Sequence, residues 1–175
     1  GTAEGPVVFD GGGDIFNGHQ GSRIKVEQDG VLNYLFGEET IYSIAIDGAN
    51  RKWFGTGSGV FVQSPAGNEE VASYTTANSP LLDNRIIDIA IDGNDALVYV
   101  ATAGGIMSLR SDAIDGGPIH SDDVYAFPNP VRPDYDGPIA IRGLARDAVV
   151  KITDVTGSIL FETRSLGGQA IWDGK

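Results

Sequence analysis

The residues that come closest to a catalytic motif are three alternating glycines, in the stretch "KWFGTGSGVF" at 52–61. A glycine-rich loop binds nucleotide phosphates when a strand precedes it and a helix follows it. Here the position three residues after Gly57 is Val60, which begins another strand pattern, and the Lys-Ser/Thr pair of a P-loop is absent. The sequence therefore predicts a turn between two strands.

Other residues of catalytic type also lack partners at a suitable spacing. His19 and His120 lie far apart, whereas metal-binding histidines usually cluster at short spacings, so both are predicted to be solvated loop residues. Ser58 has no G-x-S-x-G frame around it. Asp10 and Asp14 offer oxygen ligands to calcium without the spacing of an EF-hand, and that alternative stays open. We predict no catalytic residue, cofactor or metal ligand, and a chain that is not an enzyme.

Basic residues near the C-terminus are candidate contacts for a phosphate-bearing ligand. Of the net charge of −12, all falls in residues 1–123, which contain 6 Lys+Arg and 18 Asp+Glu, whereas 124–175 contain 6 of each. The acidic part repels nucleic acid, so no nucleic-acid partner is expected. Phosphate groups of a glycolipid would meet the neutral part, although these side chains could equally form a solvated strand face. The candidates are Arg132, Arg142, Arg146, Lys151 and Arg164.

An internal repeat determines the elements that would position these residues. Residues 42–62 align with 87–108, with Asp47 matching Asp92 and Thr56 matching Thr102. Each copy has an apolar strand ending at Asp-Gly, where glycine is expected to accept the positive φ of a hairpin turn. An aromatic strand, a glycine-rich turn and a further strand follow in both copies.

The repeat predicts blades of a β-propeller. The first copy gains a fourth strand at 71–75, and a weaker third copy lies at 13–26 and 31–36. Four strands in about 45 residues match one blade. Trp53 and Tyr99 occupy equivalent positions and are predicted to pack between blades, with a sugar-stacking platform as the alternative. The carboxylates of Asp47 and Asp92 are expected to cap backbone N–H groups.

The C-terminal part predicts a second domain. Residues 111–123 are polar and glycine-rich, which is typical of a linker. Residues 124–175 show four alternating strands, around 139–141, 150–152, 159–161 and 170–172, which predict an Ig-like β-sandwich. The fold class is therefore all-β, with about three propeller blades at 1–110 and a truncated Ig-like sandwich at 124–175.

Both parts resemble known families. "IYSIAIDG" with "KWFGTGSGV", and "IIDIAIDG" with "VYVATAGGI", resemble the two-component regulator propeller repeat over about residues 13–110, although Ala101 replaces the glycine of that pattern. "PNP" at 128–130, "DVTG" at 154–157 and "WDG" at 172–174 are similar to the C-terminal domain of proteins handled by the type IX secretion system of Bacteroidetes. That family continues with further strands that this chain does not contain.

The combined resemblance implies a non-enzymatic accessory protein of the type IX secretion system at the cell surface. Such a protein works in a complex with a sortase and delivers anionic lipopolysaccharide to it. The resemblance implies an exported protein, at the outer-membrane surface or in the periplasm. The sequence contains no run of 18 apolar residues, so no membrane span is predicted. The alternatives are a periplasmic, oligosaccharide-sensing propeller domain of a hybrid two-component system, and a secreted hydrolase whose catalytic domain would lie upstream.

Overall fold

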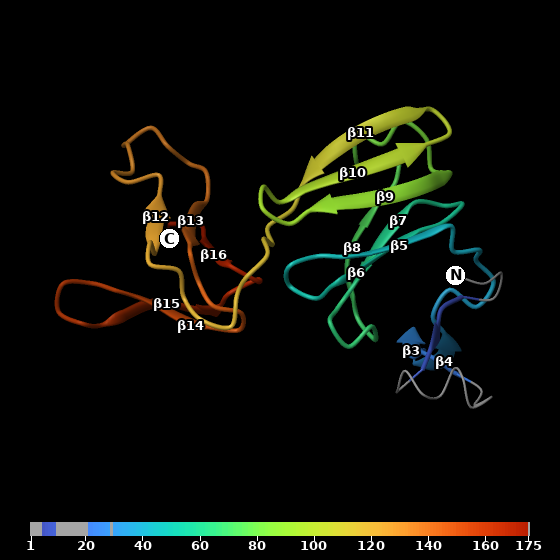
Figure 1. Ribbon diagram of the computed structural model, residues 1–175, viewed down its shortest axis with the longest axis horizontal. Coiled ribbons are helices and arrows are strands. Elements are labelled where there is room, and N and C mark those ends of the chain that lie inside the picture. Colours follow the sequence, from blue (N-terminus) through green and yellow to red (C-terminus); the bar gives the residue numbers. More distant parts are fainter. Residues whose placement is uncertain (1–4, 10–20, 29, 175) are drawn as a thin grey trace. The chain divides into compact units, whose positions relative to one another are not determined.

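The computed structural model describes residues 5–9, 21–28 and 30–174, and within them every regular element is a strand (Figure 1). The predicted all-β class is confirmed. Contacts divide the chain into two compact units. The first unit comprises Gly1–Ile46, Arg51–Ile91 and Val98–Leu109, and the second comprises Asp47–Asn50, Asp92–Leu97 and Arg110–Lys175.

Antiparallel sheets of the first unit correspond to the predicted repeats. We call the four-stranded sheet β5–β8 blade A and the three-stranded sheet β9–β11 blade B, and neighbours in sequence pair in both. Two two-stranded sheets, β1–β2 and β3–β4, precede them. The bounds are β1 Val7–Val8, β2 Ser22–Arg23, β3 Lys25–Gln28, β4 Val31–Tyr34, β5 Ser43–Ile46, β6 Lys52–Gly55, β7 Val60–Gln63, β8 Glu70–Tyr74, β9 Ile86–Asp92, β10 Leu97–Thr102 and β11 Gly105–Arg110.

The glycine-rich segments are turns between strands in both blades, as predicted. The Thr56 hydroxyl donates a hydrogen bond to the Gly59 carbonyl at 3.1 Å, and the Thr102 hydroxyl donates to the Gly105 carbonyl at 2.9 Å. The two glycines share nearly the same backbone angle, with φ of 142° and 137°. Because β7 and β11 follow these turns directly, no helix N-terminus is available there for a phosphate.

Asp-Gly turns show one prediction that holds and one that is wrong. The carboxylates of Asp47 and Asp92 each accept a hydrogen bond of 3.0 Å, from the N–H of Ala49 and of Asn94, so they cap the turns as expected. The positive φ, however, falls on Asn50 at 59° and, in the other turn, on Ala96 at 56°. These turns are longer than two residues, so the left-handed position moves away from the glycine.

Close approach explains the glycines of those turns instead. A Cβ atom on Gly48 would lie 2.0 Å from the carbonyl oxygen of Ile114, within the second unit. A Cβ atom on Gly93 would lie 2.1 Å from the Asp115 carboxylate. Glycine is therefore required at both positions because another part of the chain touches the backbone.

Two apolar layers cover the two faces of blade A. Trp53 belongs to the layer shared with blade B, and Phe54 belongs to the layer shared with the β3–β4 hairpin, because neighbouring residues of a strand face opposite sides. The prediction that Trp53 packs between blades is confirmed. The layers are Trp53, Val60, Val62, Leu81, Ile86, Ile89, Val98 and Val100, and separately Val26, Leu35, Ile41 and Phe54.

Tyr99 differs from its repeat equivalent, Trp53. Its neighbours Val98 and Val100 are fully buried, but Tyr99 is 44% exposed, so the prediction that it packs between blades is wrong. Strand alternation places Tyr99 on the opposite face of blade B, together with Ile106. A polar contact also joins the blades, where the Ser43 hydroxyl donates to Asp88 at 2.7 Å and accepts from the Ile89 N–H at 3.0 Å.

The second unit contains the strands that the alternating pattern predicted. One sheet has the order β12-β13-β16 and a separate hairpin pairs β14 with β15. The rings of Phe161 and Trp172 lie 6.4 Å apart and connect the hairpin to the sheet. These strands are β12 Tyr125–Phe127, β13 Ile139–Arg142, β14 Val149–Thr153, β15 Ile159–Arg164 and β16 Gln169–Trp172.

Part of the predicted linker packs within the second unit. Ala113 and Ile114 are buried, and the Ile114 carbonyl accepts a hydrogen bond from Gly168 N–H at 2.9 Å. The Gln169 side chain donates to the Asp112 carbonyl. The domain boundaries at 110, 123 and 124 stay a prediction.

Candidate functional site

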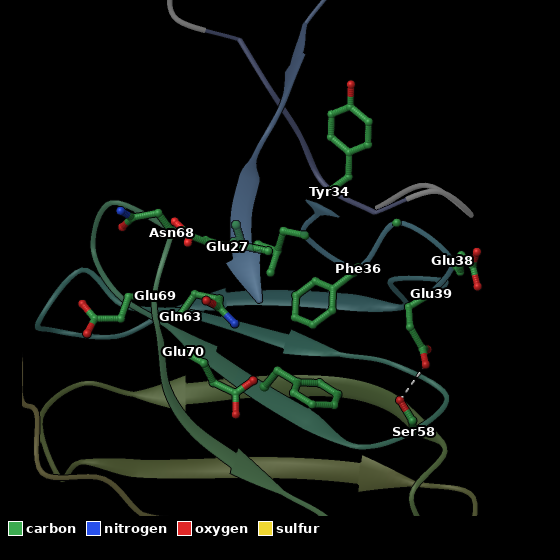
Figure 2. A pocket seen from close by; sticks show the side chains of 14 residues that line it. Glu27, Tyr34, Phe36, Glu38, Glu39, Ser58, Gln63, Asn68, Glu69 and Glu70 are labelled. Carbon is green, nitrogen blue, oxygen red and sulfur yellow. Dashed lines mark hydrogen bonds between the residues drawn. The ribbon is translucent and has the colours of Figure 1, made fainter. Parts of the chain in front are cut away.

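A hollow of about 420 Å³ opens in the first unit, and we call it the acidic hollow (Figure 2). The β3–β4 hairpin and the following loop at 35–39 form one part of its lining, and strands β7 and β8 form another. Its lining residues are Val26, Glu27, Tyr34, Leu35, Phe36, Gly37, Glu38, Glu39, Ser58, Phe61, Gln63, Asn68, Glu69 and Glu70.

A β-bulge determines the orientation of the side chains on the β7–β8 side of the acidic hollow. Val62 pairs with Ala72, but the next residue, Gln63, pairs with Glu70, so Val71 is the extra residue. A bulge re-aims the side chains next to it, and here Gln63 and Glu70 both line the hollow. Bulges are frequent next to binding sites for this reason.

Five glutamates line the acidic hollow, from three separate segments. No lysine, arginine or histidine is among the lining residues in the described part of the chain. Glu39 accepts a hydrogen bond of 2.8 Å from the Ser58 hydroxyl, which fixes one carboxylate in place (Figure 2). Arg23 is outside the lining and stacks over the Tyr34 ring at 4.1 Å. The glutamates are Glu27, Glu38, Glu39, Glu69 and Glu70.

The basic residues predicted to contact a glycolipid lie on different elements of the second unit. Lys151 on β14 and Arg164 on β15 share a face of the hairpin, because Lys151 pairs with Glu162 and Val149 pairs with Arg164. Glu162 lies between them and forms an ion pair of 3.4 Å with Lys151. Arg164 also donates to the carbonyl of Asp147 at 3.0 Å.

The other three predicted basic residues are placed apart from that hairpin face. Arg142 on β13 donates to the side chain of Gln169 at 3.2 Å and is half-buried. Arg146 is exposed in the turn before β14. Arg132 is exposed in the loop after β12 and lines a small hollow with Asp134 and Tyr135. The structure thus brings together Lys151 and Arg164 of the five.

The remaining candidates from the sequence analysis are His120, His19, Asp10 and Asp14. The ring nitrogen Nδ1 of His120 accepts a hydrogen bond of 3.0 Å from the Ala145 N–H. His19, Asp10 and Asp14 lie outside the described residues, so the calcium alternative is untested. Within the described ranges, no three His, Cys, Asp or Glu side chains are grouped as metal ligands.

The acidic hollow was missed by sequence reasoning. Four of its five glutamates form two adjacent pairs, at 38–39 and 69–70, which the repeat alignment did not connect. The available signal was weak, since one pair precedes the first strand of the repeat, the other lies at the start of its fourth strand, and nothing in their spacing indicates that they meet. Folding of the β3–β4 hairpin beside blade A brings them to one hollow.

Comparison with known proteins identifies one similar solved structure. This is PorZ, described as an essential bacterial surface component of the type IX secretion system of Porphyromonas gingivalis. The match has 32% sequence identity, a TM-score of 0.62 and covers 96% of this chain. The chain spans 23% of the length of that PorZ chain. Scans of protein-family profiles and of curated proteins gave no match. Among described residues, no helix is long and apolar enough to cross a membrane.

Proposed function

We propose that this PorZ-like chain is part of a non-enzymatic, cell-surface accessory protein of a type IX secretion system. The observation that carries the proposal is the likeness to PorZ, in both sequence and fold, over 96% of the chain. Because the chain spans 23% of PorZ, the role of the whole protein is inferred from this part. An exported protein at the outer-membrane surface fits the same likeness.

In this proposal the blades serve as a docking scaffold for other proteins of the secretion complex, including its sortase. Blade B offers a suitable surface, because the face turned away from its apolar layer carries exposed Ile87, Tyr99 and Ile106. Their exposed fractions are 57%, 44% and 74%. Contiguous apolar side chains at a surface favour contact with another protein.

The second unit would bind the phosphate groups of an anionic lipopolysaccharide. Lys151 and Arg164 support this role because they share one exposed hairpin face. Arginine binds phosphate oxygens through paired N–H groups, and lysine adds a point charge. Glu162 weakens the local positive potential, so we expect modest affinity that falls with salt.

A pull-down with the tagged full-length protein tests the docking role. We expect sortase-complex subunits in the eluate, and a loss of them with Tyr99→Ser/Ile106→Ser. Ile119→Ser is the control, because Ile119 lies in the second unit and its exposed fraction of 77% is close to the 74% of Ile106. Recovery of oligosaccharide without protein subunits would instead support the sensing function, and an eluate without either would contradict the proposal.

Binding to immobilised anionic lipopolysaccharide tests the second unit. We expect Lys151→Ala/Arg164→Ala to weaken binding by about threefold per removed cation at low salt. The control, Arg85→Ala/Arg110→Ala, removes two exposed cations elsewhere. Equal losses in both double variants would show a non-specific charge effect and reject the hairpin face as the site.

A further inference from the structure

The acidic hollow has the features of a binding site for an organic cation. Four of its five glutamates, Glu27, Glu38, Glu69 and Glu70, have no hydrogen-bond or ion-pair partner for their carboxylates within the described residues. Carboxylates that line one hollow give it a negative potential, which attracts a cation. In the view of Figure 2, Gln63, Glu69 and Glu70 lie on one side of Phe36, and Glu38 and Glu39 lie on the other.

A buried acceptor belongs to the lining of the acidic hollow. Gln63 lines it and is 2% exposed, yet its side-chain oxygen Oε1 has no hydrogen-bond partner in the described part of the chain. Buried polar atoms in folded proteins are nearly always paired, so an unpaired acceptor on a residue that lines a pocket indicates a missing donor. The bulge at Val62/Gln63 places the Gln63 side chain in the lining of the hollow.

Apolar surface between the charges favours a ligand with a hydrocarbon part. The Phe36 and Phe61 rings, 5.3 Å apart, both line the hollow. The guanidinium of Arg23 on the Tyr34 ring shows that this wall already stacks one cation. The glutamates are not grouped as metal ligands. A volume of about 420 Å³ is within the range of small-ligand sites.

We propose that the acidic hollow binds a lysine or arginine side chain carried by a segment of a partner protein. The methylene groups pack on Phe36 and Phe61, the charged end donates a hydrogen bond to Gln63 Oε1, and the glutamates neutralise the charge. This proposal is independent of the glycolipid face and of the secretion role, because it rests on the first unit alone.

Titration calorimetry of the intact protein with short peptides tests the site. The probes are N-acetylated tri-lysine amide and tri-arginine amide, and the matched neutral probe is the same tri-lysine peptide with its side chains acetylated. We expect saturable binding of both cationic peptides, weakening as salt is raised through the range that screens exposed charges. Equal binding of the acetylated peptide would overturn the proposal.

Two variants locate the binding. Glu69→Gln/Glu70→Gln should weaken it by about threefold per removed charge. Gln63→Met keeps an unbranched side chain of similar size and should weaken it by about tenfold, because a hydrogen bond from a charged donor is lost. The control, Asp122→Asn/Asp123→Asn, removes an adjacent acidic pair that is exposed in the second unit.

Stability measurements keep these variants interpretable. Gln63→Met should not lower the unfolding midpoint, because it removes a buried acceptor that has no donor. Weaker binding at an unchanged midpoint supports the proposal, whereas equal weakening by the Asp122/Asp123 control overturns it. Calcium chloride alone is a further probe. Calcium binding that Glu69→Gln/Glu70→Gln abolishes and that blocks the peptides would assign the hollow to a metal and overturn the proposal.

Discussion

Replacing Gly59 by alanine tests the glycine turn of blade A directly. Gly59 has φ of 142°, and a Cβ atom there would lie 2.5 Å from the backbone oxygen of Tyr74. Gly105 occupies the equivalent turn of blade B with φ of 137°, but its Cβ atom would meet the end of the Leu82 side chain at 3.0 Å. The two substitutions therefore share backbone strain and differ in the atom that must move.

The expected magnitudes follow from that difference. A residue with a side chain in this backbone region costs about 1–3 kcal/mol, so Gly105→Ala should lower stability by about 2 kcal/mol. Relief of the clash with Tyr74 must also disturb the bonds that the Gly59 carbonyl accepts from Thr56, at 3.0 Å from N–H and 3.1 Å from the hydroxyl. Each is worth about 1 kcal/mol, which brings Gly59→Ala to about 4 kcal/mol.

Guanidinium unfolding followed by tryptophan fluorescence measures both values. The chain has two tryptophans, Trp53 in the first unit and Trp172 in the second, so a Trp172→Phe background leaves the signal of the first unit. We expect both alanine variants to lower the midpoint at an unchanged slope, with the larger shift for Gly59→Ala. Equal shifts, or a larger one for Gly105→Ala, would refute the argument from the Tyr74 backbone.

Three further predictions concern the core and two turn or junction carboxylates. Val98→Ala, at a fully buried position, should cost about 2 kcal/mol, whereas Ile106→Ala, at a position 74% exposed, should stay within about 0.5 kcal/mol in the same unfolding assay. The Ser43 hydroxyl and then the Ile89 N–H lower the pKa of Asp88. Stability from this carboxylate is therefore present above the ordinary aspartate range and is lost as pH falls through the lowered pKa, and Ser43→Ala should raise that pKa in an NMR titration. The Thr156 hydroxyl is the main cause of the lowered pKa of Asp154, so Thr156→Val should raise it while leaving the Asp88 titration unchanged.

Residue spacing was sufficient to predict much of the fold. Thr56 and Thr102 fall at equivalent positions, and their hydroxyls close the same turn in both blades. Alternation predicted β13–β16 because polar and apolar residues in those strands face different surroundings. These features depend on local sequence, which is why the sequence alone could predict them.

Features that depend on partners distant in sequence could not be predicted. Tyr99 occupies the same position in its repeat as Trp53, and the sequence does not distinguish their surroundings. A strand pattern alone does not indicate which face of a sheet a neighbouring sheet covers. No sequence signal indicates the bulge beside Gln63, so the pairing of Gln63 with Glu70 was not predictable. Lys151 and Arg164 are two of the five candidate basic residues. Their shared face follows from the pairing register of the β14–β15 hairpin, which could not be predicted from the sequence.

The contact between Ser43 and Asp88 depends on the order of the two blades along the chain. These residues are 45 positions apart, which is the spacing between Asp47 and Asp92, so the same repeat position supplies a hydroxyl in the earlier copy and a carboxylate in the later one. Exchanging the two copies in a rearranged gene would reverse donor and acceptor and remove the serine oxygen from the Ile89 N–H. The junction is thus polarised, and the order of the repeats along the polypeptide is encoded at the boundary where they meet.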